Sequence, residues 1–192
     1  MSGHSRDIAQ LLDRQQITDF IHRYCRAADR LDVDLIKTTF WEYGAFDGGP
    51  SEGPVLDIIA AFFENVVRHM WPTSHHAVSN ILIELDGNQA FVETYLTALH
   101  LSHPQHDSRA ALLGEENALD AGFKGDDVAE FIFGGRYIDL FQRRGGEWRI
   151  FRRKIVPDWN RVGLYSGITT GGQYDLLRHR SSRDRHDPAY SR

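Results

Sequence analysis

The sequence predicts an α+β domain in which helices from the first third of the chain pack on one face of a curved antiparallel sheet. Two observations lead to this class. Apolar residues recur at helical spacing up to about residue 70 and then alternate with polar residues in long runs. Short turn signals separate these runs, which is typical of antiparallel hairpins. The 192 residues suit one core, and no repeat or linker indicates a second domain.

Three helices are expected in the first third of the chain. Residues 6–28 place apolar side chains along one helical stripe, and a short helix should follow at 33–40. The clearest helix runs over 54–70, where apolar residues hold the i, i+3, i+4, i+7 spacing and Pro54 suits a first turn. The glycine- and aromatic-rich stretch before it predicts a short strand at 44–47 between loops.

Four long strands are expected after residue 72. Asp86-Gly87-Asn88 and Gly145-Gly146 are short enough to join neighbouring strands as hairpins. Gly134 and Gly135 lie inside a strand, which indicates a bulge or a close approach to the backbone. The expected strands are 75–85, 89–103, 128–144 and 147–158.

Two segments fall outside this pattern. Residues 104–127 are polar and contain glycine, so we expect a long loop at a pocket mouth, with one helical turn at 109–113. The domain should span 1–160. The extension 161–192 is dominated by Arg, His, Ser and Gly, and we expect it to be partly disordered, from about residue 180 onward.

Composition narrows the partners and the compartment. A net charge of −5 gives no reason to expect nucleic acid or an anionic membrane as a partner, and no stretch approaches the ~20 apolar residues of a membrane span. The first residues are polar and charged, unlike a signal peptide, so we expect a cytoplasmic protein. Cys25 is the single cysteine and falls on an apolar helix face, where a buried structural thiol is commoner than a nucleophile.

Three local patterns carry a resemblance to a known family. The first is the opening helix, residues 17–20 and 24–29, which ends at an acidic residue. The second is Trp71-Pro72 followed by residues 75–80, at the entry to the first long strand. The third is residues 135–137 and 141–148, the last hairpin with its Trp. In this order and spacing, over about residues 8–159, the sequence resembles the SnoaL-like family of the nuclear transport factor 2-like superfamily. That family includes hexachlorocyclohexane dehydrochlorinase, scytalone dehydratase and bile-acid dehydratases. The resemblance implies a sheet wrapped around the N-terminal helices to form a cone-like pocket.

The resemblance also implies catalytic residues. In the dehydrochlorinase and dehydratase members, an Asp at the end of the first helix pairs with a His at the start of the first long strand. The matching positions here are Asp29 and His76, and Tyr24 matches a tyrosine of the bile-acid dehydratases. His75 adjoins His76 and stays open as the alternative base. The insertion and the tail have no counterpart, which leaves the substrate class open.

Taken by themselves, these residues allow two interpretations. Asp29 is either a solvated turn acid or a buried acceptor for an imidazole N–H. His76 and Asn80 are four residues apart in a strand, so they should share one face and line the pocket together. A carboxylate that orients an imidazole lets the other ring nitrogen remove a proton, because a histidine is mostly neutral near pH 7.

Other chemistries are less supported. No HxH or HExxH motif appears, and His100 and His103 have opposite strand parity, so we expect no metal site. No GxSxG elbow and no GxGxxG after a strand are present, so we expect no nucleophilic serine, no nucleotide and no cofactor.

Further residues are candidates for the pocket wall and for substrate binding. Arg136, Arg152 and Lys154 are expected by default to lie on the solvated surface, and stabilisation of a leaving anion by one of them is the alternative, with Arg136 the candidate for substrate binding. The aromatic candidates for the wall are Phe46, Phe62, Tyr95, Phe131, Phe133, Tyr137 and Trp159.

The leading hypothesis is a cofactor-independent lyase that removes a proton and eliminates water, halide or a small carbonyl fragment such as formaldehyde. Its substrate would be a hydrophobic aromatic, polycyclic or steroid-like molecule, as in aromatic compound catabolism. An isomerase or polyketide cyclase is the first alternative, and a ligand-binding or dioxygenase β-subunit-like module is the second. The resemblance also implies association, since many relatives with this fold are dimers or trimers. Strands near Tyr137 and Trp148 carry apolar and Arg residues on both parities, more than one buried face needs, and we expect a homo-oligomer, a trimer rather than a dimer.

Overall fold

The structure is a computed structural model, and it describes residues 3–47 and 52–191. A helix of 28 residues opens the chain, and a second long helical segment crosses the sheet from α3 through the π-helical η1 to α4. The helices are α1 (Gly3–Arg30), α2 (Val33–Thr38), α3 (Val55–Phe62), η1 (Phe63–Val67), α4 (Arg68–Met70), α5 (His106–Leu113) and α6 (Glu115–Asp120).

Six strands form one sheet in the order β2-β1-β6-β5-β4-β3. Each neighbouring pair is antiparallel except β1 and β6, which run parallel. The hairpin turns fall where the sequence predicts them, since Gly87, Gly145 and Gly146 adopt positive φ angles of 61°, 59° and 86°. The strands are β1 (Phe40–Asp47), β2 (Glu52–Pro54), β3 (Thr73–Asp86), β4 (Gln89–Leu101), β5 (Ala129–Arg144) and β6 (Glu147–Leu164).

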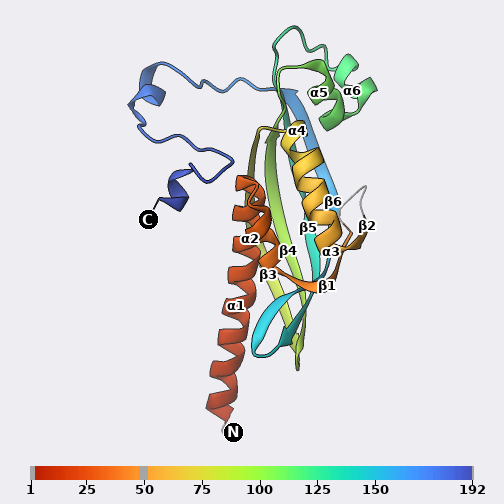
Figure 1. Cartoon of the computed structure of the whole chain (residues 1–192), viewed down its shortest axis with the longest axis vertical. Helices are drawn as coiled ribbons and strands as arrows, with labels where there is room; N and C mark the ends of the chain where they lie inside the picture. Colours follow the sequence, from red (N-terminus) through yellow and green to blue (C-terminus); the bar gives the residue numbers. More distant parts are fainter. Residues whose placement is uncertain (1–2, 48–51, 192) are drawn as a thin grey trace.

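The sheet is long and curved, and the helices lie on its concave side (Figure 1). α1 runs beside β3, and the α3–α4 segment lies across the strands from α1, so the two helical segments and the sheet enclose the core. Helix and sheet both contribute large buried side chains to this core. Examples are Ile17 and Ile21 of α1 and Phe40, Trp148 and Ile150 of the sheet, each 1% exposed or less. The predicted α+β class with a curved sheet is confirmed.

Several boundaries differ from the expected ones. The helix expected over 54–70 is interrupted by the π-helical turn η1. Pro54 is the N-cap residue, just before Val55, the first residue of α3. The expected 33–40 helix ends at Thr38 because Phe40 already pairs with β6. The loop that should follow β1 includes residues 48–51, which lie outside the described residues.

The 104–127 segment is not the plain loop that its composition predicts. It folds into α5 and α6, which pack a small apolar cluster of Leu113, Ala118 and Ala129 against the end of β5. Arg109, only 5% exposed, holds this segment together by donating to the carbonyls of Pro104, Gly125 and Asp127. The helical turn expected at 109–113 is the second half of α5.

The C-terminal extension also differs from expectation. β6 continues to Leu164, four residues beyond the expected domain end at 160. Residues 165–191 then run away from the sheet and turn back to the C-terminal end of α1 (Figure 1). This segment contains short 3-10 turns at Gly172–Leu176 and Pro188–Tyr190. Where disorder is expected from about residue 180, the structure describes a segment with defined side-chain hydrogen bonds to the last turn of α1 and to Asp32, which follows it. The division at residue 160 itself stays a prediction.

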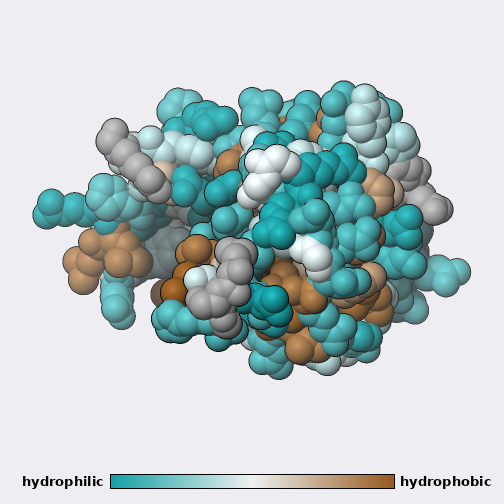
Figure 2. All heavy atoms as spheres, turned by 90° about the horizontal axis from the view of Figure 1, so that it is seen from below, coloured by the Kyte–Doolittle hydropathy of each residue, from teal (hydrophilic) through white to brown (hydrophobic). Residues whose placement is uncertain are grey.

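The surface is mostly hydrophilic when viewed from the end at which α1 begins, with apolar residues in separate patches (Figure 2). No helix among the described residues is both long enough and apolar enough to cross a membrane.

Candidate active site

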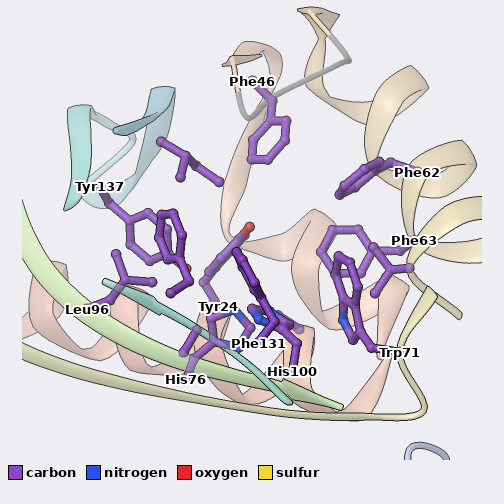
Figure 3. A pocket seen from close by; sticks show the side chains of 15 residues that line it. Tyr24, Phe46, Phe62, Phe63, Trp71, His76, Leu96, His100, Phe131 and Tyr137 are labelled. Atoms are coloured by element: carbon purple, nitrogen blue, oxygen red, sulfur yellow. The ribbon is translucent and has the colours of Figure 1, made fainter. Parts of the chain in front are cut away.

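A cavity of about 210 Å³ opens between α1, the α3–α4 segment and the concave face of the sheet. Its wall is apolar and aromatic except at one end, where two imidazoles lie side by side (Figure 3). Phe62, Phe63 and Trp71 form one flank, and Tyr137 and Leu96 form the other. The remaining wall residues are Tyr24, Ala28, Phe46, Val67, His76, Ala98, His100, Phe131, Phe133 and Ile155.

Asp29 and His76 meet at this end of the cavity. α1 ends at Arg30, and Leu31 follows with a positive φ of 50°. The Asp29 side chain in the last turn of α1 reaches β3. Its Oδ1 lies 2.7 Å from His76 Nδ1, and its Oδ2 accepts the His76 backbone N–H at 2.9 Å. The Ser74 hydroxyl donates to Oδ1 at 2.9 Å. The hydrogen bond that the resemblance implies is therefore present, across 47 positions of sequence.

These donors keep Asp29 ionised although it is only 8% exposed. Burial by itself would raise the pKa of the carboxyl group, but the hydrogen bonds and the charge of His76 outweigh burial and hold the pKa below its ordinary value. A carboxylate that accepts from Nδ1 fixes the imidazole as the Nδ1–H tautomer. Nε2 is then the nitrogen that is left for a ligand, and the ring belongs to the cavity wall.

His100 is a second imidazole in the wall that the sequence did not predict as a site residue. It lies on β4, with its ring centre 5.5 Å from that of His76 and 4.7 Å from that of Trp71. The side chain is 8% exposed, and its Nδ1 has no hydrogen-bond partner. Burial, and next the charge of His76, lower the pKa of His100 to about 3, so His100 is neutral at physiological pH.

A buried ion pair supports the opposite side of the cavity. Arg153 and Asp139 are both completely buried and form two hydrogen bonds of 2.8 and 2.6 Å. The guanidinium group lies 4.1 Å from the ring centre of Tyr24 and 3.9 Å from that of Tyr137. Arg153 Nη1 has no hydrogen-bond partner, which leaves a buried cation with one free donor group beside the two tyrosines.

Both tyrosine hydroxyls stay protonated in this environment. Burial raises the pKa of Tyr24 to about 12, although the charge of Arg153 opposes the shift. Burial likewise holds the pKa of Tyr137 well above its ordinary value. Each hydroxyl can therefore donate a hydrogen bond to a ligand oxygen or halogen without itself being an anion.

The structure brings eight of the predicted residues together. Tyr24, His76, Phe46, Phe133 and Tyr137 line the cavity, as the sequence predicts, and Asp29 lies directly behind His76. Phe62 and Phe131, also expected in the wall, are there as well. His75 points to solvent on the other face of β3, so it does not occupy the place of the base.

Asn80 is not part of the cavity. It is the extra residue of a β-bulge, because Ser79 pairs with Tyr95 and the next pair is Ile81 with Thr94. Its φ of 41° and its exposed side chain are those of a bulge residue. The expectation that it shares a face with His76 is wrong, since the bulge breaks the alternation on which that expectation rests.

Tyr95, Arg136 and Trp159 lie on the outer face of the sheet rather than in the cavity. Arg136 pairs with Glu93 and Asp158, and its guanidinium carbon lies 6.0 Å from the Tyr95 ring centre. The exposed fractions of Tyr95 and Trp159 are 45% and 53%. None of the three lines the cavity, where the sequence predicts them.

The remaining basic candidates, Arg152 and Lys154, are exposed, and the buried cation is their neighbour Arg153. Phe151 is an extra residue in β6, because Phe141 pairs with Ile150 while Leu140 pairs with Arg152. Trp148 and Ile150 face inward before this bulge, and Arg153 and Ile155 do so after it. Strict alternation of inward and outward residues, applied to the sequence alone, does not predict this exchange of faces after Phe151.

Two further expectations concern reactive groups. Cys25 is buried, and burial raises the pKa of its thiol to about 12, which agrees with a structural thiol. Within residues 3–47 and 52–191, no group of three or more His, Cys, Asp or Glu side chains could hold a metal ion.

With this geometry established, the family can be assigned. Residues 9–154 match the family model of the SnoaL-like domain. The chain belongs to the SnoaL-like family. That match covers about three quarters of the sequence and includes every cavity residue except Ile155. Its fold is the one shared within the nuclear transport factor 2-like superfamily. No curated protein matches the chain.

Solved structures share the fold of this SnoaL-like protein at low identity. A candidate scytalone dehydratase from Novosphingobium aromaticivorans is 16% identical, with a TM-score of 0.62 over 81% of this chain and 90% of the other. LinA-type3 hexachlorocyclohexane dehydrochlorinase from Novosphingobium barchaimii is 14% identical, with a TM-score of 0.64 over 86% and 99%. A Mycobacterium tuberculosis protein of unknown function is 20% identical, with a TM-score of 0.58 over 82% and 77%.

Proposed function

We propose that this SnoaL-like protein is a cofactor-independent lyase in which His76 removes a proton from a carbon atom of a hydrophobic ring compound. The observation that carries the proposal is the 2.7 Å hydrogen bond between Asp29 and His76. It lies at the end of the aromatic cavity where, among the described residues, the two imidazoles meet. A buried, oriented imidazole is suited to act on a carbon acid, since the apolar wall excludes competing water.

The proton transfer follows from the contacts of the pair. Asp29 holds His76 as the Nδ1–H tautomer, so the lone pair of Nε2 is free to accept the substrate proton. As the C–H bond breaks, the imidazole becomes a cation, and the adjacent carboxylate stabilises that charge. Ser74 keeps the carboxylate in place by its own hydrogen bond. His100 stays neutral, so it adds no second positive charge beside the imidazolium.

The departing group would leave from the neighbouring carbon. The electron pair of the broken C–H bond forms the new C=C bond, and the bond to the leaving group breaks with its electrons. Tyr24 is a neutral donor in the wall that would receive that group, and the Arg153 cation beside its ring favours a developing negative charge. The proton on His76 then passes to the leaving group or to solvent, which restores the base.

The wall supports a compact hydrophobic substrate. A volume of about 210 Å³ lies below the roughly 300–1,000 Å³ typical of pockets for drug-sized ligands. Phe46, Phe62, Phe63 and Phe133 offer flat surfaces for stacking, and no free charge faces them. Within the aromatic, polycyclic or steroid-like class, these dimensions favour a small aromatic or alicyclic ring system.

Two parts of the proposal rest on the family rather than on the cavity. Dehydratase and dehydrochlorinase neighbours of the same fold support elimination over isomerisation or cyclisation, which use the same pair without a leaving group. The cytoplasmic location and the trimer are part of the same proposal. They await measurement in the cell and in solution.

The test combines a substrate screen with variants of the pair. Ring compounds with an acidic C–H beside a leaving group, including hexachlorocyclohexane and scytalone, would be incubated with the purified chain, and the product mass measured. His76→Ala should lower turnover by about 10²–10⁴, the usual contribution of a positioned base. Asp29→Asn should lower it as well, and the double variant should lose little more than His76→Ala because the two groups act as one unit.

His75→Ala is the matched control, because His75 is the adjacent imidazole and points to solvent. It should keep wild-type turnover. A product of unchanged mass would identify an isomerase or cyclase instead. Near wild-type turnover of both His76→Ala and Asp29→Asn on a confirmed substrate would refute the lyase mechanism and favour a binding module.

A further inference from the structure

The last residues of the chain are attached to the end of α1 that carries Asp29. We call residues 182–190 the C-terminal clasp. Its Asp187 pairs with Arg30 at 3.1 Å, and its Tyr190 hydroxyl donates to Asp32 at 2.8 Å. Arg26 of α1 donates to the carbonyl of Ala189 at 3.1 Å. Several independent contacts therefore hold the clasp against one short segment, residues 26–32.

Arg183 is the clasp residue that comes closest to the site. Its guanidinium group donates to three backbone carbonyls, those of Asp29 at 3.1 Å, Ala28 at 2.9 Å and Trp71. Two of these lie in the last turn of α1, where carbonyl groups lack the backbone N–H partner of a continuing helix. The Ala28 carbonyl also accepts the Leu31 N–H, at the long distance of 3.4 Å. The third lies in the link between α4 and β3. One planar side chain thus bridges two segments that are distant in sequence.

Both bridged segments carry site residues. Ala28 and Trp71 line the cavity, Asp29 holds the carboxylate, and His76 follows Trp71 by five residues along the chain. A change in the distance between the two segments would change the Asp29–His76 hydrogen bond and the position of the Trp71 wall together. Arg183 is half-buried, and it is absent from the cavity wall.

The charge of Arg183 is as well placed as its donors. The C-terminal end of a helix carries partial negative charge, and Asp29 adds a full negative charge there. A cation on the same carbonyls offsets both. Arg30, which is also half-buried, donates to the Asp29 carbonyl at 3.3 Å, so Arg183 shares this end of the helix with a second cation.

From these contacts we infer that Arg183 is a positioning residue for the Asp29–His76 pair. It acts by fixing the end of α1 against the start of β3, and it does not touch the substrate. This role rests on the proposed function of the pair. It assigns the C-terminal extension a task in the site, although the extension lies outside the matched family domain.

The first test needs no substrate. In full-length protein with ¹⁵N-labelled histidine, the His76 Nδ1–H that is bonded to a carboxylate gives a downfield proton resonance, identified by its absence in His76→Gln. Arg183→Gln should broaden this resonance beyond detection, or speed its exchange with water about tenfold or more, because the pair opens more often. Arg180→Gln is the matched control, since Arg180 donates to the carbonyls of Tyr174 and Leu177 within the extension itself.

The second test uses whichever substrate the screen identifies. Arg183→Gln should lower kcat by about 10-fold to 100-fold, as expected when reacting groups are misplaced, while KM changes little because the cavity wall keeps its side chains. Arg183→Lys keeps the cation but cannot reach three carbonyls at once, so its loss should be intermediate. Arg180→Gln should match the wild type in both tests.

The outcomes separate this inference from the proposed function. If the wild type lacks the resonance, or His76→Ala keeps full activity, the proposed function fails and the inference falls with it. If the pair is intact and active in the wild type but unchanged in Arg183→Gln, only the role of Arg183 is refuted. If Arg183→Gln and Arg183→Lys both unfold, Arg183 is a stability residue and the inference is wrong.

Discussion

Replacing His100 by Phe tests the electrostatic description of the cavity without any ligand. His100 is surrounded by Trp71, Phe131 and His76, and its Nδ1 has no partner. Burial, followed by the charge of His76, lowers its pKa to about 3, while nearby Asp29 acts in the opposite direction. Phe has a similar size, fits the aromatic contacts and cannot be protonated.

The magnitude follows from the two pKa values. In the unfolded chain His100 takes its ordinary pKa of 6.5, so below that pH the unfolded state binds a proton that the folded state does not. The stability that His100 contributes is therefore complete above pH 6.5 and is lost as the pH falls from 6.5 toward 3. At pH 5, which is 1.5 units below the unfolded value, the loss is about 2 kcal/mol at 1.36 kcal/mol per unit.

The free energy of unfolding would be measured by urea titration at pH 8 and pH 5 for the wild type and His100→Phe. The wild type should lose about 2 kcal/mol more than the variant between these pH values, because every other titrating group is common to both. His75→Gln, at an exposed position, serves as the control and should behave like the wild type. A difference below about 0.5 kcal/mol between wild type and His100→Phe would show that His100 is solvated or paired, and the description of this wall would be wrong.

Two further predictions concern stability and assembly. Asp139→Asn leaves the buried Arg153 charge without its partner, so the free energy of unfolding should fall by about 3–5 kcal/mol in denaturant titrations. Asp158→Asn, in a solvent-screened pair with Arg136, should lower it far less. Equal losses in the two variants would contradict this ranking. The proposed homotrimer would cover exposed apolar side chains on the outer face of the sheet, among them Phe91 and Trp159. Light scattering at micromolar concentration should detect the trimer, and a monomer mass would reject it.

The fold was predictable because most of its elements have a regular apolar period. Residues of α1 such as Ile17 and Ile21 are buried at helical spacing, and glycines at the hairpin turns mark the ends of the long strands. The short elements were not predictable in the same way. β2 has three residues, and α5 and α6 have polar compositions, so tertiary packing rather than local pattern decides their structure.

The central pair was predictable for a different reason. Nothing in the spacing of Asp29 and His76 indicates that they meet, because 47 positions separate them and the contact depends on the path of α1 beside β3. The resemblance to a family supplied the pair. The C-terminal clasp had no such counterpart. Its Arg-rich composition is typical of disorder, but its partners, Asp32 and the α1 carbonyls, are visible only in three dimensions.

Three errors in the predicted site have one physical cause. They are the inward positions expected for Asn80 and Trp159, and the choice of Arg152 as a candidate when Arg153 is the buried cation. Each lies at or just after a residue that is extra in its strand, namely Asn80 in β3, Phe151 and Asp158 in β6. One extra residue exchanges the inward and outward faces of everything that follows. After Phe151 it turns Arg153 inward, and after Asp158 it turns Trp159 outward.

These bulges therefore do more than bend the sheet. Without the one at Phe151, continued alternation from Ile150 would point Arg152 inward and direct Arg153 to solvent, so the cation would no longer face Asp139 from its observed position. Apolar wall residues tolerate such a shift, because many side chains of similar size can fill a wall. A buried ion pair does not, since each charge needs its partner at hydrogen-bond distance. Apolar periodicity thus predicts much of the wall of this cavity, whereas the position of its buried cation depends on the place where alternation stops.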